Sequence, residues 1–185
     1  MDTLLQPAVT AQPPLLELFA DVLDYPGPVA AAALRRSAGM LAAASPVLRG
    51  LVNEFAVPAS AMPPAQLEEL YAATFDLQPD FTLNLTHHLF GEDHGKRSAM
   101  LIELAAAART AGLDLGGELP DHLCWMLRLL ALSPADSELQ DLTPYCILPG
   151  LRSLSQRLPP DHLYQPLFHA LFLLLADQPL AEQTA

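Results

Sequence analysis

Apolar residues recur along this chain at spacings of three and four more often than at a spacing of two, which is the pattern of amphipathic α-helices. Leu and Ala dominate the apolar positions and β-branched residues are sparse, as is typical of helical sequences. Proline, glycine, serine and aspartate interrupt the pattern where helices are expected to start or end. The pattern predicts helices at residues 15–25, 28–40, 46–55, 64–75, 81–90, 97–111, 120–132, 144–157 and 161–175.

These elements predict an all-α fold, a single-domain helical bundle of roughly nine helices. A chain of 185 residues, of which 51% are hydrophobic and 16% charged, is long enough to bury one sizeable core. We expect the helical domain to span residues 14–177, between flexible tails at residues 1–13 and 178–185. Many of the 18 prolines stand at or just before predicted helix starts, so they indicate helix boundaries and not disorder.

The longest apolar segment, residues 163–176, contains Pro166 and His169 and is shorter than the roughly 20 residues that span a bilayer. It predicts a buried helix, with no stable membrane insertion. The N-terminal residues lack a basic start followed by an apolar run, so we expect a cytoplasmic protein.

The charge balance narrows the possible partners. Nine basic against 21 acidic residues give a formal net charge of −12, which disfavours nucleic acid and anionic membrane surfaces. The same charge would attract a basic peptide.

Motifs for catalysis or for a bound cofactor are missing from the sequence. There is no Gly-x-Ser-x-Gly elbow, and Gly116-Gly117 lacks the downstream Lys-Ser/Thr of a phosphate-binding loop. The two cysteines, Cys124 and Cys146, stand in no Cys-x-x-Cys or Cys/His ligand spacing, so buried reduced thiols are expected. We therefore expect no catalytic residue and no cofactor.

A histidine-rich segment at residues 87–97 leaves several interpretations open. His88 and Glu92 are four residues apart and could form one face of a metal site, with His87 and His94 close by. The glycines at 91 and 95 suggest instead that a helix ends between these residues, and no second Glu-x-x-His pair occurs. A polar helix–loop–helix corner or a binding patch would also fit, and we expect no bound metal.

The run Glu118-Leu119-Pro120-Asp121-His122-Leu123 precedes a strongly apolar segment and resembles a helix start. Proline is tolerated in a first helical turn, and Asp121 suits the positive end of the helix dipole. A protonated His122 would be repelled by the same dipole. Helix capping therefore leaves the histidine unexplained.

A helical projection of residues 120–132 gives two apolar stripes. One, of Leu and Met residues, is the expected core face. The second would form if the helical register reached back to Glu118, and contains Glu118, His122, Trp125 and Leu129. Either this helix is buried all round, with a backbone carbonyl satisfying His122, or the second stripe is a groove wall for a helical peptide with basic flanks.

Several motifs, taken in order, resemble the redox-enzyme maturation chaperones of the nitrate reductase delta-subunit and TorD (NarJ/TorD) type. The resemblance extends over residues 70–134 and departs from the family at several positions, including Arg128, where an acidic residue is frequent. The motif residues are Tyr71-Ala72-Ala73-Thr74-Phe75-Asp76, His88-Leu89-Phe90, His94-Gly95, Ala99-Met100, Gly112-Leu113 and Glu118-Leu119-Pro120-Asp121-His122-Leu123.

This resemblance implies a non-enzymatic, all-helical chaperone that binds the N-terminal or twin-arginine signal region of a molybdenum enzyme's catalytic subunit. That molybdopterin-containing subunit, of the DMSO-reductase type, would be held in the cytoplasm until cofactor insertion. We expect a monomer or weak homodimer; the alternatives are a metal-dependent helical enzyme and a structural subunit of the mature reductase. The expected peptide-binding residues are Glu118, Asp121, His122, Trp125, Leu129, Tyr71, Phe75, His88 and Glu92.

Overall fold

The computed structural model describes residues 13–176, apart from the side chains of residues 38 and 42–44, and the regular elements in this part are all helical. The all-α prediction is confirmed, because the described residues form nine α-helices of six or more residues and a tenth of four. The predicted tails lie outside the described residues, except that Pro13 begins α1. The α-helices are α1 Pro13–Leu23, α2 Pro28–Ala44, α3 Pro46–Ala61, α4 Pro64–Tyr71, α5 Leu85–Phe90, α6 His94–Thr110, α7 Leu123–Leu132, α8 Ser137–Gln140, α9 Leu148–Arg157 and α10 Gln165–Ala176. Two π-helical turns, η1 Ala72–Asp76 and η3 Thr143–Ile147, and the 3-10 turn η2 Pro79–Phe81 complete them.

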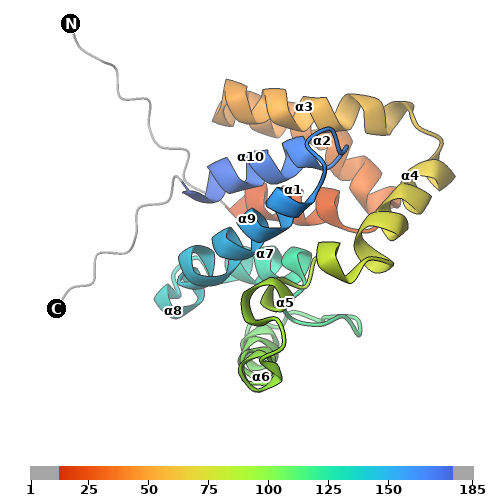
Figure 1. The fold of residues 1–185 in the computed structure, drawn as a ribbon. Helices are drawn as coiled ribbons and strands as arrows, with labels where there is room; N and C mark the ends of the chain where they lie inside the picture. The colour runs from red at the N-terminus through yellow and green to blue at the C-terminus, as the bar shows by residue number, and fades with distance from the viewer. Residues whose placement is uncertain (1–12, 177–185) are drawn as a thin grey trace, which may run out of the picture.

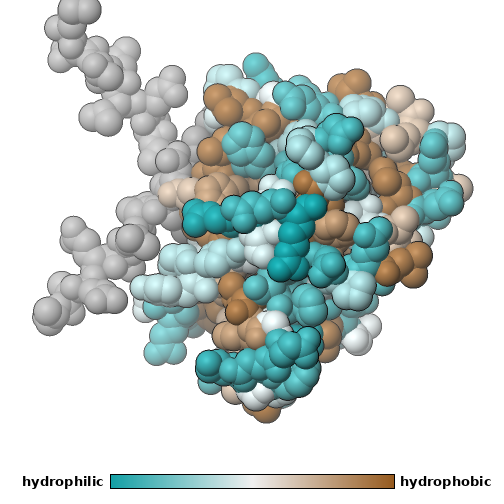
Figure 2. All heavy atoms as spheres, viewed as in Figure 1, coloured by the Kyte–Doolittle hydropathy of each residue, from teal (hydrophilic) through white to brown (hydrophobic). Residues whose placement is uncertain are grey.

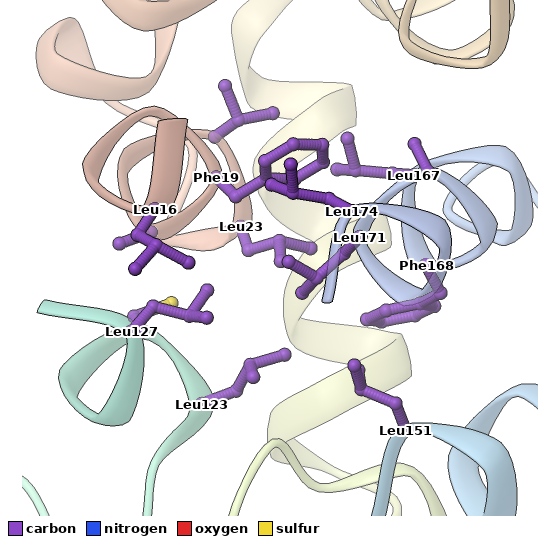
Figure 3. Packing of buried hydrophobic residues seen from close by; sticks show 14 of the residues in the cluster. Leu16, Phe19, Leu23, Leu123, Leu127, Leu151, Leu167, Phe168, Leu171 and Leu174 are labelled. Carbon is purple, nitrogen blue, oxygen red and sulfur yellow. The ribbon is translucent and has the colours of Figure 1, made fainter. Parts of the chain in front are cut away.

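The core lies where α1, α7, α9 and α10 meet. In Figure 1, α1 packs against α7 and α2, while α10 packs against α3 and α9. Figure 3 shows leucines of these helices together, and Leu23, Leu127 and Leu171 are each 0% exposed. Removal of this apolar surface from water is the main force that holds the bundle together.

Proline marks helix starts as predicted. Pro28, Pro46 and Pro64 stand at the first position of α2, α3 and α4, where a missing N–H costs no hydrogen bond. Ser45 caps α3, because its hydroxyl accepts a hydrogen bond from the Leu48 amide over 3.5 Å.

The helix predicted at residues 120–132 begins later, at Leu123. The backbone before it is engaged elsewhere: the Leu85 amide donates to the Asp121 carbonyl over 3.0 Å, and the Leu123 amide donates to the Leu83 carbonyl over 2.9 Å. Asn84 and His122 thus form an isolated antiparallel bridge. The same pairing delays the helix predicted at residues 81–90, which becomes α5.

Two of the predicted helices contain a π-helical turn. The segment 64–75 is α4 followed by η1, in which the Leu77 amide donates to the Ala72 carbonyl five residues earlier, over 3.0 Å. Likewise α9 follows η3. A π-turn holds one surplus residue, and such turns occur often at functional sites.

Two helices in the C-terminal half also differ from the prediction. The helix predicted at residues 161–175 begins at Gln165, because residues 159–164 form hydrogen-bonded turns, and α8 was not predicted.

Within the described residues no helix is long and apolar enough to cross a bilayer. On the face drawn in Figure 2, hydrophobic and hydrophilic residues are interspersed.

Candidate functional site

A cleft of about 470 Å³ opens where the end of α1, the turn η1, the segment before α5 and the start of α7 meet. We call it the acidic cleft. It brings together five of the nine residues expected from the sequence, namely Tyr71, Phe75, Glu118, His122 and Trp125. The other lining residues are Asp24, Tyr25, Asp76, Thr82, Leu83 and Asn84.

Carboxylates dominate the charge of the acidic cleft. Asp24, Asp76 and Glu118 line it, and within residues 13–176 no lysine or arginine does. Burial raises the pKa of Asp76, the Glu118 carboxylate raises it further, and His122 lowers it. These three side chains therefore interact electrostatically across the cleft.

Two aromatic side chains form the floor. Tyr71 and Phe75 are each 4% exposed, and their ring centroids lie 5.0 Å apart in an edge-on arrangement. The Tyr71 hydroxyl donates to the Leu23 carbonyl at the end of α1 over 3.3 Å. Burial raises the pKa of Tyr71, so this hydroxyl stays protonated and remains a hydrogen-bond donor to the Leu23 carbonyl. Both residues shape the cleft through packing.

His122 combines a structural backbone with an unsatisfied side chain. Its carbonyl accepts hydrogen bonds from the Trp125 and Met126 amides in the first turn of α7, over 2.9 and 3.1 Å. Its Nδ1 is buried without a hydrogen-bond partner in the described part of the chain, as is the Asn84 Oδ1. Burial lowers the pKa of His122, against the opposing effect of Glu118, so the imidazole is neutral near pH 7. Two buried polar atoms of residues that line the cleft thus have no hydrogen-bond partner among the described residues.

Asp121 does not line the cleft. Its side chain is 0% exposed, accepts a hydrogen bond from the Thr86 hydroxyl, and lies 3.7 Å from Arg97 Nη2. Arg97 Nε also donates to the Thr86 hydroxyl, over 3.2 Å. The contacts among Asp121, Thr86 and Arg97 join α5, α6 and the turn before α7, so the role of Asp121 is structural.

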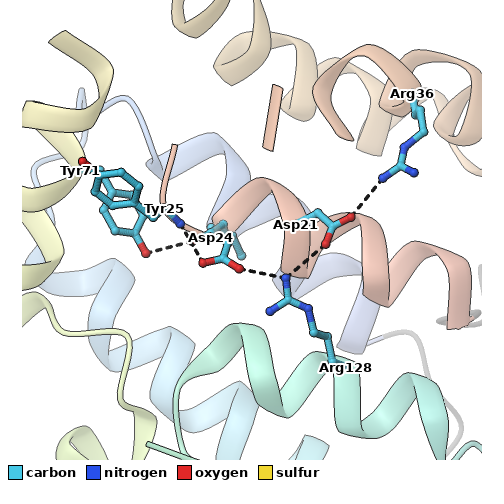
Figure 4. A network of polar contacts seen from close by, with 7 residues as sticks. Asp21, Asp24, Tyr25, Arg36, Tyr71 and Arg128 are labelled. Carbon is cyan, nitrogen blue, oxygen red and sulfur yellow. Dashed lines mark hydrogen bonds and ion pairs between the residues drawn. The ribbon is translucent and has the colours of Figure 1, made fainter. Parts of the chain in front are cut away.

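The expected stripe of Trp125 and Leu129 is divided by the structure. Leu129 is 2% exposed and belongs to the core, whereas Trp125 is partly exposed at the cleft. The Arg128 guanidinium carbon lies 4.6 Å from the Trp125 ring centroid. Figure 4 shows the same guanidinium paired with Asp21, which lies on α1, and with Asp24, which directly follows α1.

The histidine-rich segment forms a polar corner. Gly91 has a φ of +51°, which ends α5 before Glu92, and Glu92 is fully exposed. His88 Nε2 donates to the Thr82 carbonyl over 2.7 Å, and His94 lies at the start of α6. Neither His88 nor Glu92 lines the cleft. Among residues 13–176 no group of three or more His, Cys, Asp or Glu side chains is placed to hold a metal ion.

Some cleft residues were missed by the sequence analysis. Asp76 ends the Tyr71–Asp76 motif and could have been chosen with it. Asp24 and Asn84 stand outside every motif, and only the tertiary fold brings them to the cleft. Arg128 was noticed solely as a departure from the family pattern.

No protein-family model matches the chain, and no curated protein matches it. The geometry of the acidic cleft and the ordered motifs are therefore the features that bear on function.

A second hollow, of about 680 Å³, lies beside the turn between α1 and α2. Apolar residues from the end of α1, from α2, α3 and α4 form most of its wall, among them Val22, Leu34, Phe55 and Leu67. We call it the apolar hollow. Asp24-Tyr25 faces the acidic cleft and Pro26-Gly27 faces the apolar hollow, so the two are neighbours along one turn.

Proposed function

We propose that this protein is a non-catalytic chaperone whose acidic cleft binds a positively charged N-terminal segment of a molybdenum enzyme's catalytic subunit. It acts in the cytoplasm and holds the subunit until molybdopterin is inserted, before any export. Binding is an equilibrium without bond-making, and it ends when the mature subunit no longer presents the segment.

The observation that carries this proposal is the combination of charge and unused acceptors in one cleft. Asp76 and Glu118 are exposed carboxylates, and Asn84 Oδ1 and neutral His122 Nδ1 can each accept a hydrogen bond. A guanidinium or ammonium group supplies both the positive charge and the donors that these groups lack. A net charge of −12 would also steer a basic segment toward the protein.

The positions of the motif residues support the same proposal. Tyr71–Asp76 and Glu118–Leu123 are more than forty residues apart in the sequence, yet both contribute side chains to the acidic cleft. They are two of the ordered motifs on which the resemblance to maturation chaperones depends. A shared binding surface would account for both of them.

The apolar hollow offers a place for the rest of the guest. An export leader has basic residues followed by an apolar stretch, and the acidic cleft and the apolar hollow share one turn. This arrangement replaces the apolar contact expected from Leu129, which is buried. A guest bound across the turn would bury apolar surface next to its ion pairs.

Calorimetric titration with the N-terminal peptide of a molybdoenzyme catalytic subunit, chosen from the genes that neighbour this chain's gene, tests the proposal. We expect binding by the wild type, and binding about tenfold or more weaker for a protein with Asp76→Asn and Glu118→Gln. The matched control, Glu138→Gln with Asp141→Asn, removes the same charge from exposed residues at α8 and should bind normally. The absence of heat with the wild type, or equal loss in the control, would overturn the proposal.

The maturation step needs a second measurement. A chaperone should co-purify with the cofactor-free catalytic subunit and be absent from the purified mature enzyme. Its presence there in stoichiometric amount would favour a structural subunit.

A further inference from the structure

Arg128 on α7 binds two carboxylates and one aromatic ring at once. Its Nη2 lies 2.9 Å from Asp24 Oδ2 and 3.2 Å from Asp21 Oδ1 (Figure 4). Its guanidinium carbon lies over the Trp125 ring, 4.6 Å from the ring centroid. A guanidinium pairs with carboxylates and also stacks on aromatic faces, so a carboxylate beside an aromatic ring suits an arginine side chain.

Two of these partners belong to the acidic cleft. Asp24 and Trp125 line it, whereas Arg128 does not, so the guanidinium reaches them from behind the wall. A guest arginine that entered the cleft would meet a carboxylate and a tryptophan that Arg128 already occupies.

We infer that Arg128 fills one of the cation positions of the acidic cleft and thereby determines how many positive charges of a guest contribute to binding. This inference rests on the proposed function, since it concerns the specificity of the same cleft. Arg36 and Arg128 balance Asp21 and Asp24, which leaves Asp76 and Glu118 to attract the guest. Because Arg128 already occupies Asp24 and Trp125, a second arginine of the guest finds neither that carboxylate nor that ring free.

Removal of the Arg128 side chain would open this position to a guest. Its Nη1 is buried without a hydrogen-bond partner among the described residues, and the Asp24 side chain is 40% exposed toward solvent. Loss of the Arg128–Asp24 contact therefore breaks an incompletely satisfied ion pair at the wall of the cleft, and Asp24 becomes available to a guest.

Two peptides and three variants test the inference. One peptide carries two adjacent arginines, and in the other the second arginine is replaced by glutamine. Arg128→Met keeps an aliphatic stem and frees Asp24 and Trp125. The control, Arg36→Met, removes the same charge from Asp21, which it pairs at 3.0 Å, and leaves the contacts of Asp24 and Trp125 in place. Arg128→Lys keeps the charge without the planar stack and fork.

The measured quantity is the ratio of the two dissociation constants. We expect the wild type and Arg36→Met to favour the two-arginine peptide by about twofold or less, and Arg128→Met by about tenfold. Trp125 is the only tryptophan of the chain, so its fluorescence reports both guest binding and loss of the stacked guanidinium. If Arg128→Met does not fold, Arg128→Lys is expected to give a ratio of about threefold.

The possible failures are distinguishable. If the peptides bind and the ratio in Arg128→Met, or in Arg128→Lys where that is the folded variant, equals that of the wild type, this inference is overturned and the proposed function stands. A rise of the ratio in Arg36→Met to the same extent would overturn it as well. If neither peptide binds any of the proteins, the proposed function and this inference fail together.

Discussion

Asn84 and His122 pair as an isolated antiparallel bridge, although they belong to separate segments of the chain. This pairing brings the residues before α5 next to the residues before α7, and both segments line the acidic cleft. The bridge fixes the position of two unused acceptors, Asn84 Oδ1 and His122 Nδ1, on one wall.

Asp121→Ala should destabilise the fold by about 2–4 kcal/mol, because it leaves Arg97 and Thr86 without their buried acceptor. Urea denaturation measures this change in the free energy of unfolding. Asp161→Ala is the matched control, since Asp161 stands in a similar Pro-Asp-His-Leu run but is exposed. If the Asp121→Ala variant kept its stability but no longer bound the peptide, Asp121 would instead be a peptide-binding residue.

Leu129→Ala should cost about 2–5 kcal/mol of stability, because it leaves a cavity in the core at a residue that is 2% exposed. The peptide affinity of the folded fraction should not change. Leu132→Ala at the end of the same helix, where the leucine is 51% exposed, should cost about 0.5 kcal/mol or less. Thermal melts and titrations of both variants would contradict this assignment if Leu129→Ala stayed stable and bound weakly.

Binding of a cationic peptide should weaken as the pH falls below about 6.5. Burial holds the pKa of His122 below that value, so the imidazole gains its proton there and repels the guest. The raised pKa of Asp76 acts in the same direction, because its carboxylate is neutralised earlier than usual on acidification. We expect a three- to tenfold loss, roughly, between pH 7.5 and 5.5.

Titrations of wild type and His122→Gln across this range measure that effect. Glutamine does not titrate, so the variant should lose only the part that depends on Asp76. A wild-type affinity that rises on acidification would contradict the role given to the imidazole.

The stability of the protein should also fall on acidification. Burial lowers the pKa of His88, His122 and His162 below the value of 6.5 expected for the unfolded chain. As the pH falls through 6.5 the unfolded state therefore binds more protons than the folded state, and the free energy of unfolding decreases.

We expect a loss on the order of 1 kcal/mol from each of His88 and His122 between pH 7 and 5.5, and less from the more exposed His162. Urea midpoints at these pH values measure it, and His88→Gln with His122→Gln should flatten the profile. Greater stability at pH 5.5 than at pH 7 would be incompatible with buried neutral histidines.

The sequence was sufficient to predict most of the helices and the starts of α2, α3 and α4, because proline position and apolar spacing are local properties. It placed the start of α7 three residues too early, since Pro120-Asp121 is a favourable helix start. The Leu83 carbonyl accepts from the Leu123 amide and the Leu85 amide donates to the Asp121 carbonyl, and these backbone hydrogen bonds override that local preference. Such pairing is not visible in the spacing of a single segment.

The candidate site was predicted only in part, because several of its residues meet through tertiary contacts that the spacing of one segment does not reveal. Glu118, His122 and Trp125 were expected to share a helical stripe, and they meet at the cleft without one, because Glu118 lies in a turn. Asp24 reaches the cleft only through the packing of α1 on α7. Side chains that meet through tertiary packing carry no local signal.

The π-helical turn η1 makes the cleft sensitive to chain length. Its surplus residue shifts the register of everything that follows, and Phe75 and Asp76 reach the cleft in that shifted register. Deletion of one residue at 72–74 would restore an ordinary α-helical turn and rotate the positions before it by about 100° relative to those after it. Tyr71 and Asp76 could then no longer serve the same cleft, so substitutions in this turn should be tolerated far better than single-residue insertions or deletions.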